Sequence, residues 1–188
     1  MYTTLNNIRE HNPCTDGWEK LLKYLGKTKP DDEPLSLLTI LDSNGFDHTL
    51  WCFRAVDGFE KEKLLLGIGY AREVEHLMPA NSKKALDVFE RYANGLATKE
   101  EFETARRGAE VTYTAILYAS WDAICAARAA ARAADAADAA CAADAAAYAA
   151  GAAFAPYTAA ARAATRSTIR VKQEAQLREL LERTCTPL

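Results

Sequence analysis

The feature that most constrains the fold is a run of alanine. Between Ala115 and Ala164, more than half of the positions are alanine. Alanine is the best intrinsic helix former and loses no side-chain rotamers on burial. A helix covered with methyl groups also lets a neighbouring helix approach to about 8 Å, the short end of normal helix spacing. The run therefore predicts long, tightly packed helices.

The alanine run is too long to form one straight helix. A single helix over residues 98–165 would be about 100 Å long at ~1.5 Å per residue. Proline clashes with the carbonyl four residues earlier, so Gly151 and Pro156 predict a break. We expect one helix over 98–150 and a last helix that ends near Arg183. Their alanine faces would pack as an antiparallel hairpin.

Polar residues recur every three positions along part of the run, from Arg132 to Asp144. At ~100° per residue, such positions wind around a helix and form no single stripe. Two arrangements remain open. Either both sides of the helix are partly wet, or different levels of the helix face different neighbours.

The rest of the chain is divided into short helical segments by turn signals. Gly26, the sequence Asp-Ser-Asn-Gly at 42–45, Pro79 and Gly95 each follow an apolar periodic segment. No segment alternates apolar and polar residues long enough to indicate a strand. The sequence therefore predicts an all-α protein.

The expected architecture is a multi-helix bundle of short antiparallel helices with a long alanine-rich C-terminal helical hairpin. We place the short helices in an N-terminal region, 1–97, and the alanine-rich helices in a second region, 98–188. Thr98 and Glu101 form a capping-box pattern at the start of the second region. The two regions are expected to form one continuous domain.

Charge and cysteine content indicate the class of protein. The formal net charge of -3 gives no general reason to expect a nucleic-acid partner, because nucleic-acid binders usually carry a basic face. Charged residues interrupt the alanine run, so no apolar stretch of about 20 residues can span a membrane. The start, MYTTLNNIREHNP, lacks the build of a signal peptide. Five cysteines, an odd number, indicate free thiols. We expect a cytoplasmic protein.

The sequence carries no recognised catalytic signature. It contains no GxSxG, HExxH or CxxC motif. Gly67 and Gly69 lack the further glycine and the preceding strand of a phosphate-binding loop. Asp135, Asp138 and Asp144 are spread around their predicted helix and do not converge as catalytic carboxylates would. We therefore expect a protein that is not an enzyme and that holds no cofactor.

Two His/Cys pairs have spacings compatible with a four-coordinate zinc site. His11 precedes Cys14 by three residues, and His48 precedes Cys52 by four, a spacing that shares one helix face. In the alternative interpretation, Cys52 is a small buried thiol within LWCFRAV and His48 is solvated. We favour this alternative and expect no metal. If a metal were bound, these four residues would be the candidate ligands.

Two groups of side chains are candidates for partner binding. Arg162, Arg166 and Arg170 recur every four residues on the last predicted helix. Like charges at this spacing repel, so the row meets an acidic protein partner or a nucleic acid, or it is a solvated face. The predicted turn also carries large aromatic groups that can serve as contact anchors. These are Tyr148, Phe154 and Tyr157.

The chain resembles a known family over nearly its whole length. The specific part of the resemblance is NIREHNPCTDGWEKLLKYLGKTKPDDEPLSLLTILDSNG, followed by LWCFRAVDG. The segments EVEHLM, ALDVFERYANGLAT and LRELLERT, together with the alanine-rich tail, continue it. These residues are similar to the alanine-rich immunity-protein family of phages and bacteria. The resemblance implies an intracellular, non-enzymatic protein that neutralises a toxin or effector by binding it, and it supplies no catalytic or ligand residues.

These observations lead to one main hypothesis of function. We expect a non-catalytic, protein-binding inhibitor of phage or mobile-element origin, whose partner is a toxin, an effector or a host defence protein. One alternative is a structural scaffold that forms a homodimer through its alanine-rich helices. Another is an enzyme with an unrecognised site.

Overall fold

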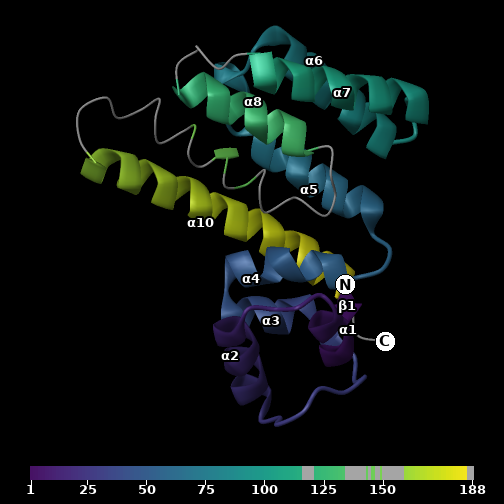
Figure 1. The fold of residues 1–188 in the computed structure, drawn as a ribbon, viewed down its shortest axis with the longest axis vertical. Coiled ribbons are helices and arrows are strands. Elements are labelled where there is room, and N and C mark those ends of the chain that lie inside the picture. Colours follow the sequence, from purple (N-terminus) through teal and green to yellow (C-terminus); the bar gives the residue numbers. More distant parts are fainter. Residues whose placement is uncertain (116–120, 134–142, 144, 147–148, 150–158, 186–188) are drawn as a thin grey trace. The chain divides into compact units, whose positions relative to one another are not determined.

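The computed structural model describes residues 1–115, 121–133, 143, 145–146, 149 and 159–185. It confirms the predicted all-α fold (Figure 1). The chain forms two compact units. Unit 1 comprises Met1–Phe59 and Glu174–Leu188, and unit 2 comprises Glu60–Gln173. The regions expected from the sequence, 1–97 and 98–188, do not coincide with these units, because both termini belong to unit 1.

Unit 1 is built from short helices and one minimal sheet. Helix α3 contacts both α2 and α4 along the chain, and the end of the C-terminal helix completes the unit. The elements are β1 (Tyr2–Thr3), α1 (Leu5–Glu10), α2 (Thr15–Leu25), β2 (Leu35–Ser36), α3 (Leu37–Asn44), α4 (Phe46–Trp51), the 3-10 helix η1 (Cys52–Ala55) and α10 (Ala159–Thr184).

The sheet of unit 1 departs from the sequence prediction, which contained no strand. Strands β1 and β2 pair antiparallel, with Tyr2 opposite Ser36 and Thr3 opposite Leu35. Each strand has two residues. A ladder of this length is too short to produce the apolar–polar alternation by which strands are recognised in a sequence.

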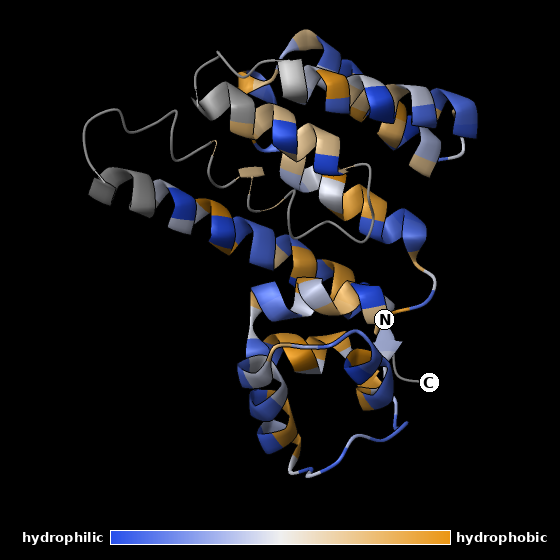
Figure 2. Ribbon diagram, viewed as in Figure 1, coloured by the Kyte–Doolittle hydropathy of each residue, from blue (hydrophilic) through white to orange (hydrophobic). Residues whose placement is uncertain are grey.

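Large apolar side chains fill the core of unit 1. The first five residues of α3 are mostly hydrophobic (Figure 2), and its Leu37 and Ile40 are fully buried. Leu177 and Leu181 of α10 are buried as well. Gly45 separates α3 from α4 with a φ of 87°, a conformation that glycine adopts without strain. This tight junction sets the direction in which α4 leaves α3.

Unit 2 is a bundle of helices. Helix α7 packs on α6, and α8 contacts α5, α6 and α7. The elements are α5 (Glu60–Arg72), the 3-10 helix η2 (Glu75–Leu77), α6 (Ala80–Ala93), α7 (Lys99–Ala115), α8 (Trp121–Ala133) and the first part of α10, as far as Gln173.

The continuous helix expected over 98–150 is wrong. Helices α7 and α8 lie against each other (Figure 1), which two segments of one straight helix cannot do. The continuous helix would also have exposed most of its alanine methyl groups. Packing α8 on three neighbours buries them. The predicted break at Gly151–Pro156 lies outside the described residues, whereas the last helix ends at Thr184, close to the predicted end.

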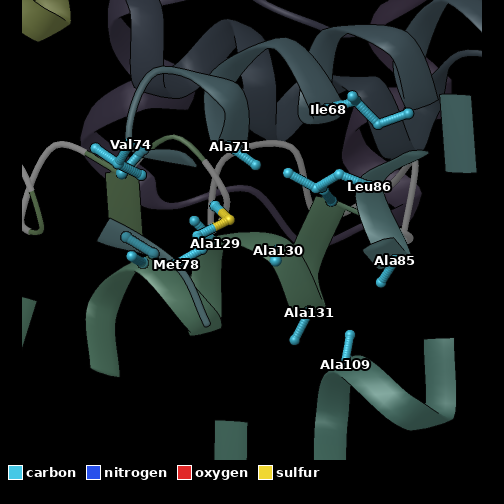
Figure 3. Close-up of a cluster of buried hydrophobic side chains, with 14 of the residues drawn as sticks. Ile68, Ala71, Val74, Met78, Ala85, Leu86, Ala109, Ala129, Ala130 and Ala131 are labelled. Atoms are coloured by element: carbon cyan, nitrogen blue, oxygen red, sulfur yellow. The ribbon is translucent and has the colours of Figure 1, made fainter. Parts of the chain in front are cut away.

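Alanine forms much of the core of unit 2. In α8, Ala126, Ala129, Ala130 and Ala133 are fully buried. In Figure 3, Ala131 of α8 and Ala109 of α7 point toward each other. Positions 135, 138, 141 and 144, on which the two open arrangements depended, lie outside the described residues.

Small residues bring α5 and α8 close together. A Cβ placed on Gly67 of α5 would lie 3.4 Å from the carbonyl oxygen of Ala133 in α8. The backbones therefore approach each other with no side chain between them. This contact is the close helix approach that the alanine run predicted.

The predicted capping box at the start of α7 is confirmed. The backbone N–H of Glu101 donates to Thr98 Oγ1 at 3.2 Å, and the N–H of Thr98 donates to Glu101 Oε2 at 2.7 Å.

In α10, the side-chain amide of Gln173 donates to the carbonyl of Ala143 at 2.9 Å, and Tyr70 Oη donates to the carbonyl of Gln173 at 3.3 Å. No helix among the described residues combines the length and apolar character needed to cross a membrane.

Candidate functional site

Unit 1 contains a pocket of about 250 Å³ between α1, α2, α3 and α4. Its walls are mostly apolar and include Ile8, Leu21 and Ile40. Two half-buried tryptophans, Trp18 and Trp51, also line it. The polar lining residues are Cys14, Asn44, Asp47 and His48, with the buried Cys52.

Cys14 and His48 form a thiol–imidazole pair in this pocket. Cys14 Sγ lies 3.7 Å from His48 Nε2, within hydrogen-bond distance for sulfur. The other ring nitrogen, Nδ1, lies 3.2 Å from the carbonyl oxygen of Asn44. A carbonyl can only accept, so Nδ1 carries the proton. In the neutral ring, Nε2 is then an acceptor for the thiol proton.

A buried amide fixes the elements that carry this pair. The Asn44 side chain donates to the carbonyl of Gly17 in α2 at 2.7 Å and accepts from Ser43 Oγ at 2.9 Å. Asn44 and Ser43 are both buried. Asn44 thus holds α2 with its side chain and His48 with its backbone. Because a buried amide is costly to leave unpaired, this network fixes the position of α2 relative to α4.

Gly17 makes room for the pair. A Cβ at this position would lie 2.6 Å from His48 Cδ2, 2.7 Å from His48 Nε2 and 3.0 Å from Cys14 Sγ. Real Cβ atoms do not approach other atoms so closely. Any side chain larger than that of glycine would therefore displace the imidazole or the thiol.

Cys14 also occupies the N-cap position of α2, and its side chain makes no capping hydrogen bond. Serine, threonine, aspartate and asparagine are the residues that cap helices well. The residue at this helix end is therefore a poor choice for helix stability. Its exposed thiol instead lies against His48, at the end of the helix where the backbone dipole favours negative charge.

The second cysteine of the pocket has a different environment. Cys52 is buried, and burial raises the pKa of its thiol to about 12. Arg54 lowers this pKa by its positive charge, while Cys14 raises it. Cys52 is therefore a neutral thiol at physiological pH. Its burial is what the packing interpretation predicted, whereas the solvated His48 of that interpretation is wrong, because His48 is half-buried and its ring contacts Cys14 and Asn44.

The structure brings three of the four candidate zinc ligands to one pocket. Cys14, His48 and Cys52 line it, whereas His11 is exposed and does not. Within the described part of the chain, no group of three or more His, Cys, Asp or Glu side chains is placed to hold a metal ion. Sequence reasoning missed Gly17 and Asn44. Gly17 leaves room for His48 and Cys14, and Asn44 hydrogen bonds to the backbone of α2 and to the His48 ring.

The candidate partner-binding residues lie elsewhere. Arg166 and Arg170 of α10 are half-buried. Burial raises the pKa of the Tyr70 phenol, and the positive charge of Arg170 lowers it. Arg162 belongs to the start of α10. The predicted aromatic anchors Tyr148, Phe154 and Tyr157 lie outside the described residues.

A second cavity, of about 530 Å³, lies between α6 and α7 in unit 2. Its walls include Lys84, Glu100, Thr104 and the exposed Gly108. No histidine or cysteine lines it. It therefore lacks a candidate nucleophile and base, and the Cys14–His48 pocket is the better candidate for a functional site.

No family model, curated protein or solved structure matches this chain. The candidate site therefore stands on its own geometry.

Proposed function

We propose that this protein neutralises a toxin, effector or defence protein by binding it, and that the Cys14–His48 pocket receives an apolar side chain of that partner. The pocket is the observation that carries the proposal. Most of its lining comes from the two segments, 7–45 and 50–58, that carry the specific part of the family resemblance. The partner is thus a protein with an exposed leucine, methionine or aromatic anchor.

The pocket has the properties of a binding hot spot. Hot spots are enriched in tryptophan and centre on pockets that exclude water. Trp51 is held in place by Arg54, whose guanidinium lies 4.7 Å from the ring centroid and donates from Nε to the Trp51 carbonyl at 3.0 Å. Side chains fixed in this way lose little entropy when a partner binds.

The test is quantitative co-purification of the full chain from its source cells. Trp18→Ala, a pocket variant, is compared with Tyr24→Ala, which removes an aromatic ring from the same helix at a position 59% exposed and outside the pocket. We expect a stoichiometric protein bound to the parent chain and to Tyr24→Ala, and lost from Trp18→Ala. Equal recovery with all three chains, or no stoichiometric protein, would contradict the proposal.

The alternative, self-association through the alanine faces, lacks such an observation. The described alanines of α8 from Ala126 to Ala133 are buried within unit 2. They are thus unavailable to a second copy unless the unit opens. Light scattering that shows a mass rising with concentration would favour this alternative.

A further inference from the structure

We propose that Cys14 and His48 are a nucleophilic pair that accepts an acyl group from an acyl thioester, with the short apolar chain of that group lying in the pocket of unit 1. The inference goes beyond the proposed function and does not rest on it, since the transfer needs no partner protein.

The first support is the geometry of the pair. A nucleophilic cysteine needs a base within hydrogen-bond reach, and the base needs a third group to orient it. His48 Nε2 lies 3.7 Å from Cys14 Sγ, and the Asn44 carbonyl holds Nδ1 at 3.2 Å. This arrangement selects the tautomer that can take the thiol proton.

The second support is independent of the pair and comes from the pocket. Its volume of about 250 Å³ corresponds to roughly eight water molecules at ~30 Å³ each, which suits an acyl chain of a few carbons. Leu21, Ile40 and Trp18 line it, and such walls favour a chain without charge. The thiol lies at this pocket and is itself exposed, so a donor can reach it from solvent.

The third support is the position of Cys14 at the start of α2. The first amides of a helix have no acceptor within the helix, and in α2 these include the N–H groups of Asp16 and Gly17. Cys14 Sγ makes no capping hydrogen bond to these amides, but their partial positive charge at the helix end favours negative charge on the nearby thiolate. The helix end thus assists the same step as His48.

The transfer is balanced without an oxidant or a metal. His48 Nε2 accepts the thiol proton, and Cys14 Sγ attacks the thioester carbonyl carbon. The bond from that carbon to the donor sulfur then breaks, and the electron pair leaves with the donor sulfur. The donor sulfur takes the proton from His48. The products are S-acyl Cys14 and a free donor thiol, so one thioester replaces another.

The experiment is incubation of the full chain with the hexanoyl thioester of N-acetylcysteamine, followed by intact mass measurement and peptide mapping. We expect one hexanoyl group on Cys14, removable by hydroxylamine, with Cys52 unmodified. His48→Gln and Gly17→Ala should each slow the acylation by at least about tenfold, since a positioned base typically contributes more than this. Gly17→Ala acts by displacing the imidazole, because its Cβ would meet the ring.

Two matched controls separate this chemistry from general thiol reactivity. Cys125→Ala removes a buried thiol of unit 2, away from the pocket, and His76→Gln removes an exposed histidine of unit 2. Both should leave the rate within about twofold of the parent chain. If Cys14 is not acylated, or if Cys185 is acylated as fast in the same sample, the proposal is overturned. An unchanged rate in a folded His48→Gln or Gly17→Ala chain, checked by circular dichroism, would overturn it as well.

Discussion

Units 1 and 2 solve the problem of helix packing in opposite ways. In unit 1, leucine, isoleucine and phenylalanine side chains hold short helices apart, and a pocket remains between them. In unit 2, methyl groups and glycine bring helix backbones close together around α8. The large side chains of unit 1 leave a pocket between its helices, whereas alanine and glycine leave little space where α8 meets α5.

The cysteines show what this difference means for chemistry. Cys125 is buried in the alanine-rich core of unit 2, among methyl groups. Cys14 is exposed beside a histidine at a pocket. A cysteine is thus a buried core residue in unit 2 and a candidate nucleophile in unit 1. A reactive group needs space for a ligand beside it, and the pocket of unit 1 supplies that space at Cys14.

The largest effect is expected from a cavity in unit 1. Leu37→Ala removes a side chain that is fully buried. The lost burial and the remaining cavity should lower the free energy of unfolding by about 2–5 kcal/mol. Urea unfolding followed by circular dichroism measures this. Leu96→Ala, at a position 69% exposed, is the matched control. A loss of stability no larger than that of the control would mean that unit 1 does not depend on large side chains.

The opposite change tests unit 2. Ala130→Leu adds a side chain where the methyl group is fully buried and α8 meets three helices. We expect a loss of about 1–3 kcal/mol, because an overfilled core forces neighbouring groups apart. Ala80→Leu, at an exposed position in α6, controls for the change in residue type. If Ala130→Leu were as stable as the parent chain, the close packing around α8 would be disproved.

Much of this fold could be predicted from local signals. The capping box of Thr98 and Glu101 and the end of the last helix follow from residues adjacent in sequence. The packing of α8 against α7 could not be predicted, because the sequence between them, 116–120, contains no glycine or proline to mark the end of a helix. The composition of unit 1 could not be predicted either, because Leu177 and Leu181 are far in sequence from the other residues of its core.

The candidate site was predicted in part. The spacing of His48 and Cys52 drew attention to this segment as a candidate zinc site, but the interpretation favoured there was a buried thiol and a solvated histidine without metal. The partner of His48 is Cys14, which lies 34 residues away. Gly17 and Asn44 carry no signal in a single sequence, because a glycine in a helix and an asparagine at its end are both common. Their roles follow from distances alone.

A smaller effect, and a gain, is expected at the site itself. Cys14→Ser places a good capping residue at the N-cap of α2, where the cysteine side chain makes no capping bond. The serine hydroxyl can accept from the N–H of Asp16 or Gly17. We expect the free energy of unfolding to rise by up to about 1 kcal/mol, measured by urea unfolding. Cys52→Ser, at a buried position, should destabilise the chain instead. A destabilised Cys14→Ser chain would show that the thiol serves packing.

The smallest expected change in the free energy of unfolding concerns the exposed capping box at the start of α7. This feature does not depend on how the core of either unit is packed. Hydrogen bonds from the backbone N–H and the hydroxyl of Thr98 lower the pKa of Glu101 below its ordinary value of 4.5. The stabilisation is therefore complete above pH 4.5 and is lost as the pH falls through the lowered pKa. Glu101→Gln keeps a capping side chain but does not titrate. The stability difference between the parent chain and Glu101→Gln should shrink between pH 7 and pH 3 in urea unfolding. Glu100→Gln removes a charge from the same turn and controls for general charge effects. If the stability differences of Glu101→Gln and Glu100→Gln from the parent chain changed equally with pH, the hydrogen bonds between Glu101 and Thr98 would not be the cause. The capping-box pattern at Thr98 would then mark the start of a helix without stabilising it.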